Sequence, residues 1–144
     1  MARPWASRSL LALLVLLAVG CAATRPPQRN EIESVMKVSS GRAMVVAGGR
    51  RLPGPEITER LSGNTLQDVY KTYTWRFLPD GTFAWGGNGG ADGNWYSTGT
   101  WRVEDDSFCW TLDGFDMGCR ALFEWKGALR MSGKDSGLEK WGFY

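Results

Sequence analysis

Histidine does not occur anywhere in the 144 residues of this chain. Its absence excludes Ser-His-Asp and Cys-His nucleophile systems and most zinc sites, because imidazole serves these sites as base or ligand. A pair of carboxylates, as in glycosidases, is the catalytic arrangement that remains. The acidic residues that could supply it lie in expected turns, where backbone hydrogen bonds alone favour aspartate. They are Glu104, Asp105, Asp106, Asp113 and Asp116.

We therefore predict a protein that is not an enzyme and that holds no cofactor and no metal. The segments "DGFD" and "EDDS" carry oxygen ligands, but neither has the alternating ligand spacing of a calcium loop. An enzyme with an acidic catalytic pair stays open as the least favoured of three hypotheses.

An excess of charge of one sign is also missing. Lys and Arg number 17, and Asp and Glu number 15. Arg3 and Arg8 lie within residues 1–20, so the rest of the chain has 15 charges of each sign and is formally neutral. Binding to nucleic acid depends on a basic surface. The sequence therefore predicts no nucleic-acid partner.

Long apolar runs are absent after residue 20. The one such run, "LLALLVLLAV" from Leu10 to Val19, follows Arg3 and Arg8. It is too short to cross a bilayer as a helix, which takes roughly 20 apolar residues, and it has the length of a signal-peptide core. Residues 1–20 are therefore predicted to be a signal peptide, and no transmembrane helix is expected elsewhere.

The segment "LAVGC", Leu17 to Cys21, follows that run and resembles the lipobox of bacterial lipoproteins. The resemblance implies cleavage after Gly20, a lipid on the sulfur of Cys21 and an acylated amino terminus, with palmitate as the expected acyl group. Ala18 stands where the family usually has Leu. Ala22 stands where the family's inner-membrane signal has Asp, so the resemblance implies an outer-membrane anchor on the periplasmic face. A plain secretory signal cut near "CAA", with an unmodified Cys21, is the alternative.

The chain after the signal is long enough for one domain. It opens on "AATRPPQRN", which is polar and without period, so residues 21–40 are predicted to be a lipidated tether and residues 41–144 a β-barrel domain. Within that domain "AMVVA", residues 43–47, is a candidate strand. One short helix is expected over residues 55–64, because proline suits its first turn and Ser-Gly its end.

From Thr72 onward the chain has the pattern of β-strands. Tyr73, Trp75 and Phe77 alternate with polar residues, and "LPDGT" then forms a turn before "FAW" resumes the pattern. About seven or eight short strands follow one another, with turn signals every eight to twelve residues. We therefore predict a mainly all-β fold, a small antiparallel up-and-down β-barrel with one short helix. Gly99, in the middle of a strand, predicts a bend or close packing against a neighbour.

Two cysteines remain if Cys21 carries lipid, and an oxidising compartment favours their pairing. Cys109 and Cys119 lie five residues on either side of Gly114. A three-residue hairpin loop, Asp113-Gly114-Phe115, would therefore place them opposite each other, near disulfide distance. This register also sets Phe123 and Trp125 on the face opposite to Phe108 and Trp110, and the sequence leaves open which face is interior.

A glycine-rich stretch, residues 86–94, separates two aromatic strands. Phosphate cradles place such glycines between a strand and a helix, so this stretch is predicted to be a hairpin loop, with a flap at a barrel mouth as the alternative. Most tryptophans are expected to fill the core. The candidate ligand or partner contacts lie at or near the stretch: Trp85, Trp95, Tyr96 and Trp101.

The runs "YSTGTWRVEDDSFCW" and "CRALFEW" resemble small β-domains of bacterial envelopes with a lipocalin-like barrel. The resemblance covers roughly residues 61–144, implies an eight-stranded barrel with a binding role, and transfers no ligand residues. We predict an outer-membrane-anchored periplasmic lipoprotein that binds a small ligand without catalysis. The alternative is a protein-binding module or an inhibitor of an envelope enzyme. An empty apolar cavity would favour the ligand, and a filled core with an exposed Trp85 or Trp95 would favour the partner.

Overall fold

The computed structural model describes residues 26–70, 72–87, 95–133 and 137–144, with only the backbone of Trp95, Lys140 and Trp141. These parts contain three helices and ten strands. In chain order they are α1 (Arg29–Met36), α2 (Gly41–Val46), β1 (Arg50–Arg51), α3 (Gly54–Leu61), β2 (Thr65–Gln67), β3 (Tyr73–Phe77), β4 (Thr82–Gly87), β5 (Trp95–Glu104), β6 (Ser107–Leu112), β7 (Phe115–Arg120), β8 (Leu122–Trp125), β9 (Ala128–Ser132) and β10 (Leu138–Phe143). The prediction of a mainly β, antiparallel fold is confirmed.

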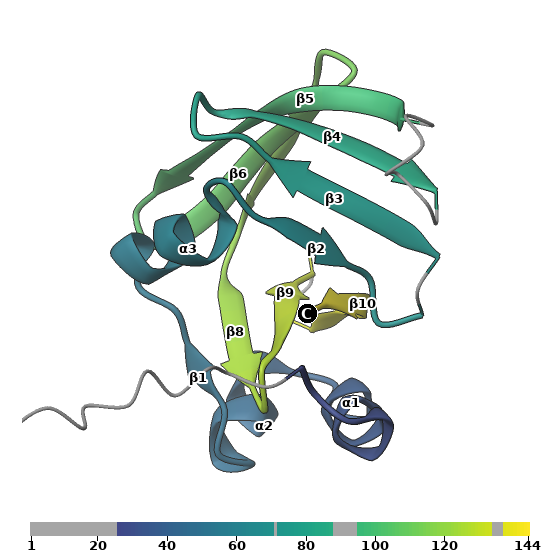
Figure 1. Cartoon of the computed structure of the whole chain (residues 1–144). Coiled ribbons are helices and arrows are strands. Elements are labelled where there is room, and N and C mark those ends of the chain that lie inside the picture. The colour runs from purple at the N-terminus through teal and green to yellow at the C-terminus, as the bar shows by residue number, and fades with distance from the viewer. Residues whose placement is uncertain (1–25, 71, 88–94, 134–136) are drawn as a thin grey trace, which may run out of the picture.

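The strands form two sheets, with the order β2-β3-β4-β5-β6-β7 in one and β1-β8-β9-β10 in the other (Figure 1). The chain crosses from the first sheet to the second between β7 and β8. At the other side the end of β10 meets the end of β2 over a short stretch. Gln67 and Tyr144 exchange two backbone hydrogen bonds of 3.2 and 3.1 Å, and the N–H of Val69 donates to the carbonyl of Gly142 at 2.9 Å. The predicted closed barrel is therefore wrong in this respect: the short β2 and a single bridge, Asp68 to Phe143, leave the barrel open.

The main core lies between the two sheets and is built largely from rings. The predicted alternation in β3 is confirmed, since Trp75 and Phe77 are buried while Arg76 is exposed. The rings contact one another across strands. For example, the ring centroids of Trp75 and Phe83 are 5.5 Å apart. The core consists of Leu52, Ile57, Leu61, Leu66, Trp75, Phe77, Phe83, Trp101, Phe108, Trp110, Leu122, Leu129, Met131 and Phe143. Each large side chain buried in this way contributes roughly 1.5–3 kcal/mol to stability.

The short helix predicted over residues 55–64 is confirmed as α3, which flanks this core. Ile57 and Leu61 lie four residues apart on one face and are both buried. Glu56 lies in the first turn and Arg60 in the last, which suits the helix dipole. The N–H of Gly54 donates to a carboxylate oxygen of Asp106 at 2.6 Å and so fixes the start of α3 to the β5–β6 turn.

A second, smaller core covers the opposite face of the four-stranded sheet. Val35 of α1, Met44 of α2 and Ala128 of β9 are fully buried there, and Phe123 and Trp125 pack against them. This arrangement answers the question that the hairpin register left open. Phe108 and Trp110 face the main core, whereas Phe123 and Trp125 face the helices, because β8 belongs to the other sheet.

The structure corrects the expected strand at residues 43–47, which form most of α2. Ser40 caps this helix through its side-chain oxygen, which accepts the N–H of Ala43 at 3.2 Å. Burial of Met44 holds the helix in place against the β-propensity of its two valines. Helix α1 lies within residues 21–40, the range expected to be a tether, so the packed part of the chain includes residues ahead of 41. No helix in the described ranges is both long and apolar enough to cross a membrane.

The predicted register of the cysteine hairpin is confirmed, since Cys109 lies opposite Cys119 and the two form a disulfide. The expected three-residue loop is wrong. Asp113 and Gly114 form a two-residue turn with positive φ angles of 49° and 85°. The pairing shifts register between Trp110 and Thr111, where β7 contains one residue more than β6, so Cys109 still lies opposite Cys119. Gly118 has a positive φ of 76° at this bulge.

Candidate functional site

Three aromatic side chains extend the main core to the surface, at the beginning of β3, near the end of β4 and at the beginning of β5. Tyr73 stacks on Trp85 with ring centroids 4.9 Å apart, and Tyr96 meets Trp85 edge-on at 5.7 Å. Trp85 also meets the buried Trp75 edge-on at 6.5 Å. We refer to Tyr73, Trp85 and Tyr96 as the aromatic ladder. The ladder combines exposed rings with a rigid support, which is typical of binding hot spots.

The exposure of the ladder increases outward from the core. Trp85 is partly buried and packs against the main core. Tyr73 is 38% exposed and Tyr96 is 64% exposed. Tyr96 lies against the backbone of Gly87, where a Cβ atom would come within 2.6 Å of the tyrosine hydroxyl. Glycine at position 87 thus lets the outer ring fold down onto β4.

Asp68 positions Tyr73, one of the two outer rings of the ladder. This residue is 4% exposed, and its carboxylate accepts the backbone N–H groups of Tyr70, Thr72 and Tyr73 at 3.1, 2.6 and 2.5 Å. These bonds fix the turn that leads into β3. Asp68 was not among the residues predicted from the sequence. Its one local signal is an Asp a few residues ahead of a predicted strand, from where a carboxylate can bond backbone N–H groups further along the chain.

The structure brings together two of the four predicted contact residues. Trp85 and Tyr96 belong to the ladder. Trp101 is only 8% exposed and its indole N–H donates to the carbonyl of Leu78 at 3.0 Å, so it is a core residue and not a surface contact. Trp95 begins β5, and its side chain lies outside the described residues. Tyr73 joins the site instead, and its place in the alternating run of β3 was the available signal.

The predicted hairpin loop and the predicted lipidation site lie largely outside the described residues. Residues 88–94 are not described, but β4 ends at Gly87 and β5 begins at Trp95, and these two strands are antiparallel neighbours. The glycine-rich stretch therefore connects two strands, as predicted, and no helix follows it directly. Cys21 also lies outside the described residues.

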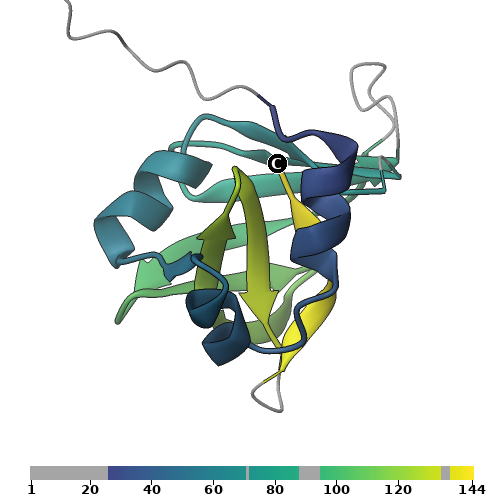
Figure 2. The same cartoon turned by 90° about the horizontal axis from the view of Figure 1, so that it is seen from below.

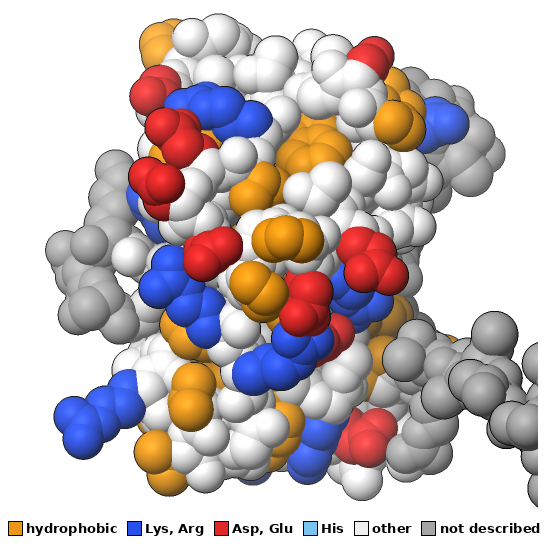
Figure 3. Space-filling model, turned by 90° about the vertical axis from the view of Figure 1, so that its left-hand side faces the viewer, with side chains coloured by type: hydrophobic (Ala, Val, Ile, Leu, Met, Phe, Trp, Pro, Cys, Tyr) orange, Lys and Arg blue, Asp and Glu red, His pale blue; other side chains and the backbone are white. Residues whose placement is uncertain are grey.

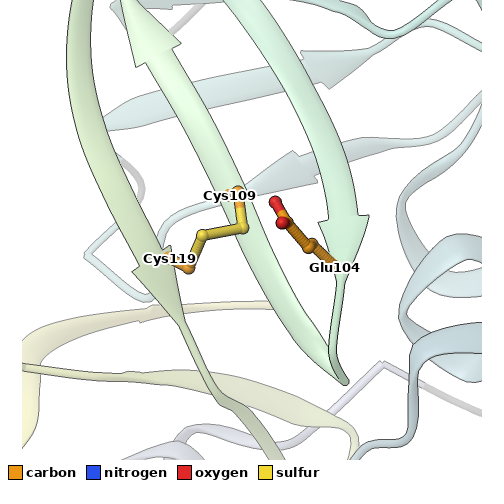
Figure 4. Close-up of side chains that lie close together, drawn as sticks. All are labelled: Glu104, Cys109 and Cys119. Atoms are coloured by element: carbon orange, nitrogen blue, oxygen red, sulfur yellow. A yellow bond between two sulfur atoms is a disulfide. The ribbon is translucent and has the colours of Figure 1, made fainter.

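One cluster has the composition of a metal site, namely Glu104, Cys109 and Cys119 (Figure 4). Ligand atoms of the three lie within 4.8 Å of one another. Both sulfurs are joined to each other in the disulfide, so neither is available as a thiolate ligand. The carboxylate of Glu104 accepts a hydrogen bond from Nε of Arg102 at 3.1 Å. The chemistry of this cluster does not fit a bound metal.

The other acidic candidates serve the geometry of turns. Asp113 accepts the hydroxyl of Ser97 at 2.7 Å, and Asp116 accepts the N–H of Gly118 at 2.8 Å. Asp105 and Asp106 have positive φ angles of 46° and 55° in the β5–β6 turn. Each has a structural role there, as turn chemistry predicted. The absence of catalysis itself stays a prediction.

An open groove of about 910 Å³ runs along α1. Ile32 and Met36 form one wall, and Val69, Tyr70 and Tyr144 form the other. Arg29, Glu33 and Lys37 lie at its margins. Elsewhere the surface is mixed: on the face shown in Figure 3, acidic and basic side chains lie interspersed with scattered hydrophobic ones.

The sequence was also compared with known proteins. No protein-family model, no curated protein and no solved structure matches this chain significantly.

Proposed function

We propose that the protein is a lipoprotein of the bacterial outer membrane, anchored through Cys21, whose periplasmic β-domain binds a protein partner and has no catalytic role. The anchor is supported by the lipobox resemblance of residues 17–21. The binding role is supported by the aromatic ladder, because exposed Trp and Tyr on a rigid support are the usual anchors of protein interfaces.

The observation that carries the choice of partner is the filled core. Fourteen buried side chains, five of them Trp or Phe from β3, β4 and β6, pack between the sheets. A ligand in the interior would have to displace them at a cost of several kcal/mol. The ladder offers the alternative, since Tyr96 is 64% exposed while Trp85 holds it to the core. Of the two binding hypotheses from the sequence, this arrangement favours the protein-binding module.

Site-specific photo-crosslinking in growing cells tests this proposal. A photoreactive phenylalanine analogue replaces Tyr96 in the full-length chain. The matched control position is Phe115, an aromatic residue that is 73% exposed on β7. We expect a discrete crosslinked band from position 96, absent from position 115 and lost when Trp85→Ala is added. Equal bands from both positions, or none from position 96 in a folded protein, would contradict the proposal.

The groove along α1 supports a second candidate, binding of a small amphiphilic ligand. Its volume of about 910 Å³ lies within the range of small-molecule sites, and its walls are apolar with charged margins. The test is the binding of an anionic naphthalene dye, followed by fluorescence. We expect Met36→Trp, which fills the groove, to abolish the fluorescence increase, whereas Met117→Trp on β7 leaves it unchanged. An unchanged signal in Met36→Trp would exclude the groove.

A further inference from the structure

The two N-terminal helices and the β8–β9 turn cover one end of the molecule. Figure 1 shows α1 and α2 below the sheets, and Figure 2, seen from below, shows both helices in front of them. Nζ of Lys126, in the β8–β9 turn, donates to the hydroxyl of Ser34 in α1 at 3.3 Å, which joins the turn to the helices. We refer to the exposed residues of α1, α2 and this turn as the basal face.

Hydrophobic side chains on the basal face are exposed where a helix would normally be polar. Val46 is 82% exposed and Val45 is 51% exposed in α2. Ala43 and Ala47 beside them are exposed as well. The same helix buries Met44 on its inner side, so the valines are not part of either core. Together these side chains form an exposed apolar patch, the kind of surface that marks a contact with a membrane or a partner.

The charges on the basal face are predominantly basic. Arg29, Lys37, Arg42 and Lys126 are exposed, against two acidic residues, Glu31 and Glu33, which gives four positive and two negative charges. Glu33 is already paired with Arg29 at 3.1 Å. Arg42 lies three and four residues before Val45 and Val46 on α2, so it adds positive charge close to the exposed valines. Lys126 adds a further positive charge on the same face. Basic residues beside exposed apolar ones are the pattern of surfaces that bind anionic lipid headgroups.

The length of chain ahead of this face identifies the occupant. Pro26 and Pro27 line the groove along α1, so the described chain begins at this end of the molecule. Cys21 is five residues from Pro26. A fully extended chain of this length reaches at most about 18 Å. A folded domain of this length is about 35 Å across. A domain held by so short a tether has the end that bears Pro26 at the bilayer and the far end away from it.

We propose that the basal face is a membrane-docking surface, which lies on an anionic lipid bilayer with Val45 and Val46 at the level of the headgroups and Arg42 and Lys126 against lipid phosphates. This inference rests on the proposed lipid anchor at Cys21. The anchor supplies attachment, and the basal face supplies orientation. The helices of the domain then face the bilayer. The six-stranded sheet, on the other side of the main core, faces the periplasm.

The experiment uses the full, lipidated chain in vesicles of phosphatidylethanolamine and phosphatidylglycerol. A fluorophore is attached at Val46→Cys in one sample and at Phe115→Cys, in the six-stranded sheet, in the other. A quencher is carried on lipid chains near the headgroups. We expect several-fold stronger quenching at position 46 than at position 115. Equal quenching at the two positions in vesicle-bound protein would overturn the proposal.

Two further measurements test the lipid anchor and the basic residues separately. Flotation of the vesicles reports the anchor alone, so a protein that does not float with the vesicles contradicts the proposed lipid anchor and not the orientation. The double variant Arg42→Glu/Lys126→Glu tests the basic residues, with Arg102→Glu, an exposed arginine on β5, as the matched control. We expect the double variant to lose most of the quenching at position 46 and the control to keep it. Unchanged quenching in the double variant would overturn the role of anionic lipid.

Discussion

Gly99 shows how one residue decides whether β5 can follow its curved path. An added Cβ at this position would lie 1.9 Å from the carbonyl oxygen of Thr111 and 2.7 Å from the ring of Phe83. Neither neighbour can move easily, because one is backbone and the other is a fully packed core ring. The glycine thus lets β5 pass between its two neighbouring strands at close range, as its position in mid-strand predicted.

We expect Gly99→Ala to destabilise the fold by about 1–3 kcal/mol, the usual range for overpacking in a tight core. Urea unfolding followed by tryptophan fluorescence measures the loss as a lower midpoint at unchanged slope. Gly137→Ala is the matched control, because the nearest atom to its Cβ is the carbonyl oxygen of Ser39 at an ordinary 3.5 Å. Equal midpoints for the two variants would show that β5 relaxes freely at Gly99.

The charged carboxylate of Asp80 stabilises the β3–β4 turn. Hydrogen bonds from the hydroxyl and the N–H of Thr82 hold the pKa of its carboxyl below the ordinary value of 3.8. The ionised form is therefore favoured in the folded state. Its contribution to stability is complete above the ordinary pKa and is lost as pH falls through the lower, folded value.

We predict a steeper loss of thermal stability between pH 4 and lower pH in the unchanged protein than in Thr82→Ala, which removes the stronger of the two bonds. Asp80→Asn provides the reference with no titrating group at this position. Melting temperatures measured across this range by circular dichroism check the prediction. Parallel curves for the unchanged protein and Thr82→Ala would contradict it.

At the scale of elements, Arg130 of β9 binds α1 to the four-stranded sheet. Its side chain is 2% exposed, and Nη1 donates to the carbonyls of Val35 and Val38 at 2.9 and 2.8 Å. These carbonyls lie at the end of α1, where the helix dipole favours a positive charge. Burial lowers the pKa of Arg130 from its usual range. The carbonyls at the helix end thus stabilise the buried positive charge of Arg130, and its N–H groups satisfy those carbonyls.

We expect Arg130→Met to cost about 3 kcal/mol, because the carbonyls of Val35 and Val38 both lose the guanidinium donor, and Val35 keeps only the N–H of Val38 at 3.3 Å. Arg102→Met, on the exposed side of β5, is the control and should change the free energy of unfolding by less than about 0.5 kcal/mol. Hydrogen exchange should show the loss first in α1. A variant with unchanged protection in α1 would show that Arg130 is not what holds the helix.

The sequence predicted elements well where the pattern was local. The ring alternation around Trp75, the turn at Asp80 and the cysteine register all depend on residues within one hairpin, and the structure confirms them. It did not predict α1 and α2, because helices of eight and six residues are stabilised by the packing of Val35 and Met44 rather than by propensity. The buried position of Arg130 was not predicted for the same reason, because its face of β9 is buried only where α1 packs over it.

At the scale of the whole molecule, the arrangement of the sheets depends on contacts far apart in the chain. Trp85 and Trp101 were both predicted from the sequence as candidate contacts at or near the glycine-rich stretch. The structure separates them, because Trp101 is bonded to Leu78 inside the core whereas Trp85 carries the ladder at its margin. Whether the barrel closes likewise depends on how β10 meets β2, for which no local pattern exists. The sequence therefore predicted the region of the candidate site but not which side chains form it.

The membrane attachment proposed for the molecule predicts the behaviour of two neighbouring variants. Cys21→Ser removes the acceptor of the lipid, and each methylene withdrawn from the bilayer loses about 0.8 kcal/mol, so the protein should move from the membrane to the soluble fraction. Ala22→Asp keeps the acceptor, and the lipobox resemblance implies that it stays membrane-bound but moves from the outer to the inner membrane. Fractionation on a density gradient with immunoblotting distinguishes the three distributions. A Cys21→Ser protein that stays with the outer membrane would contradict the lipid anchor.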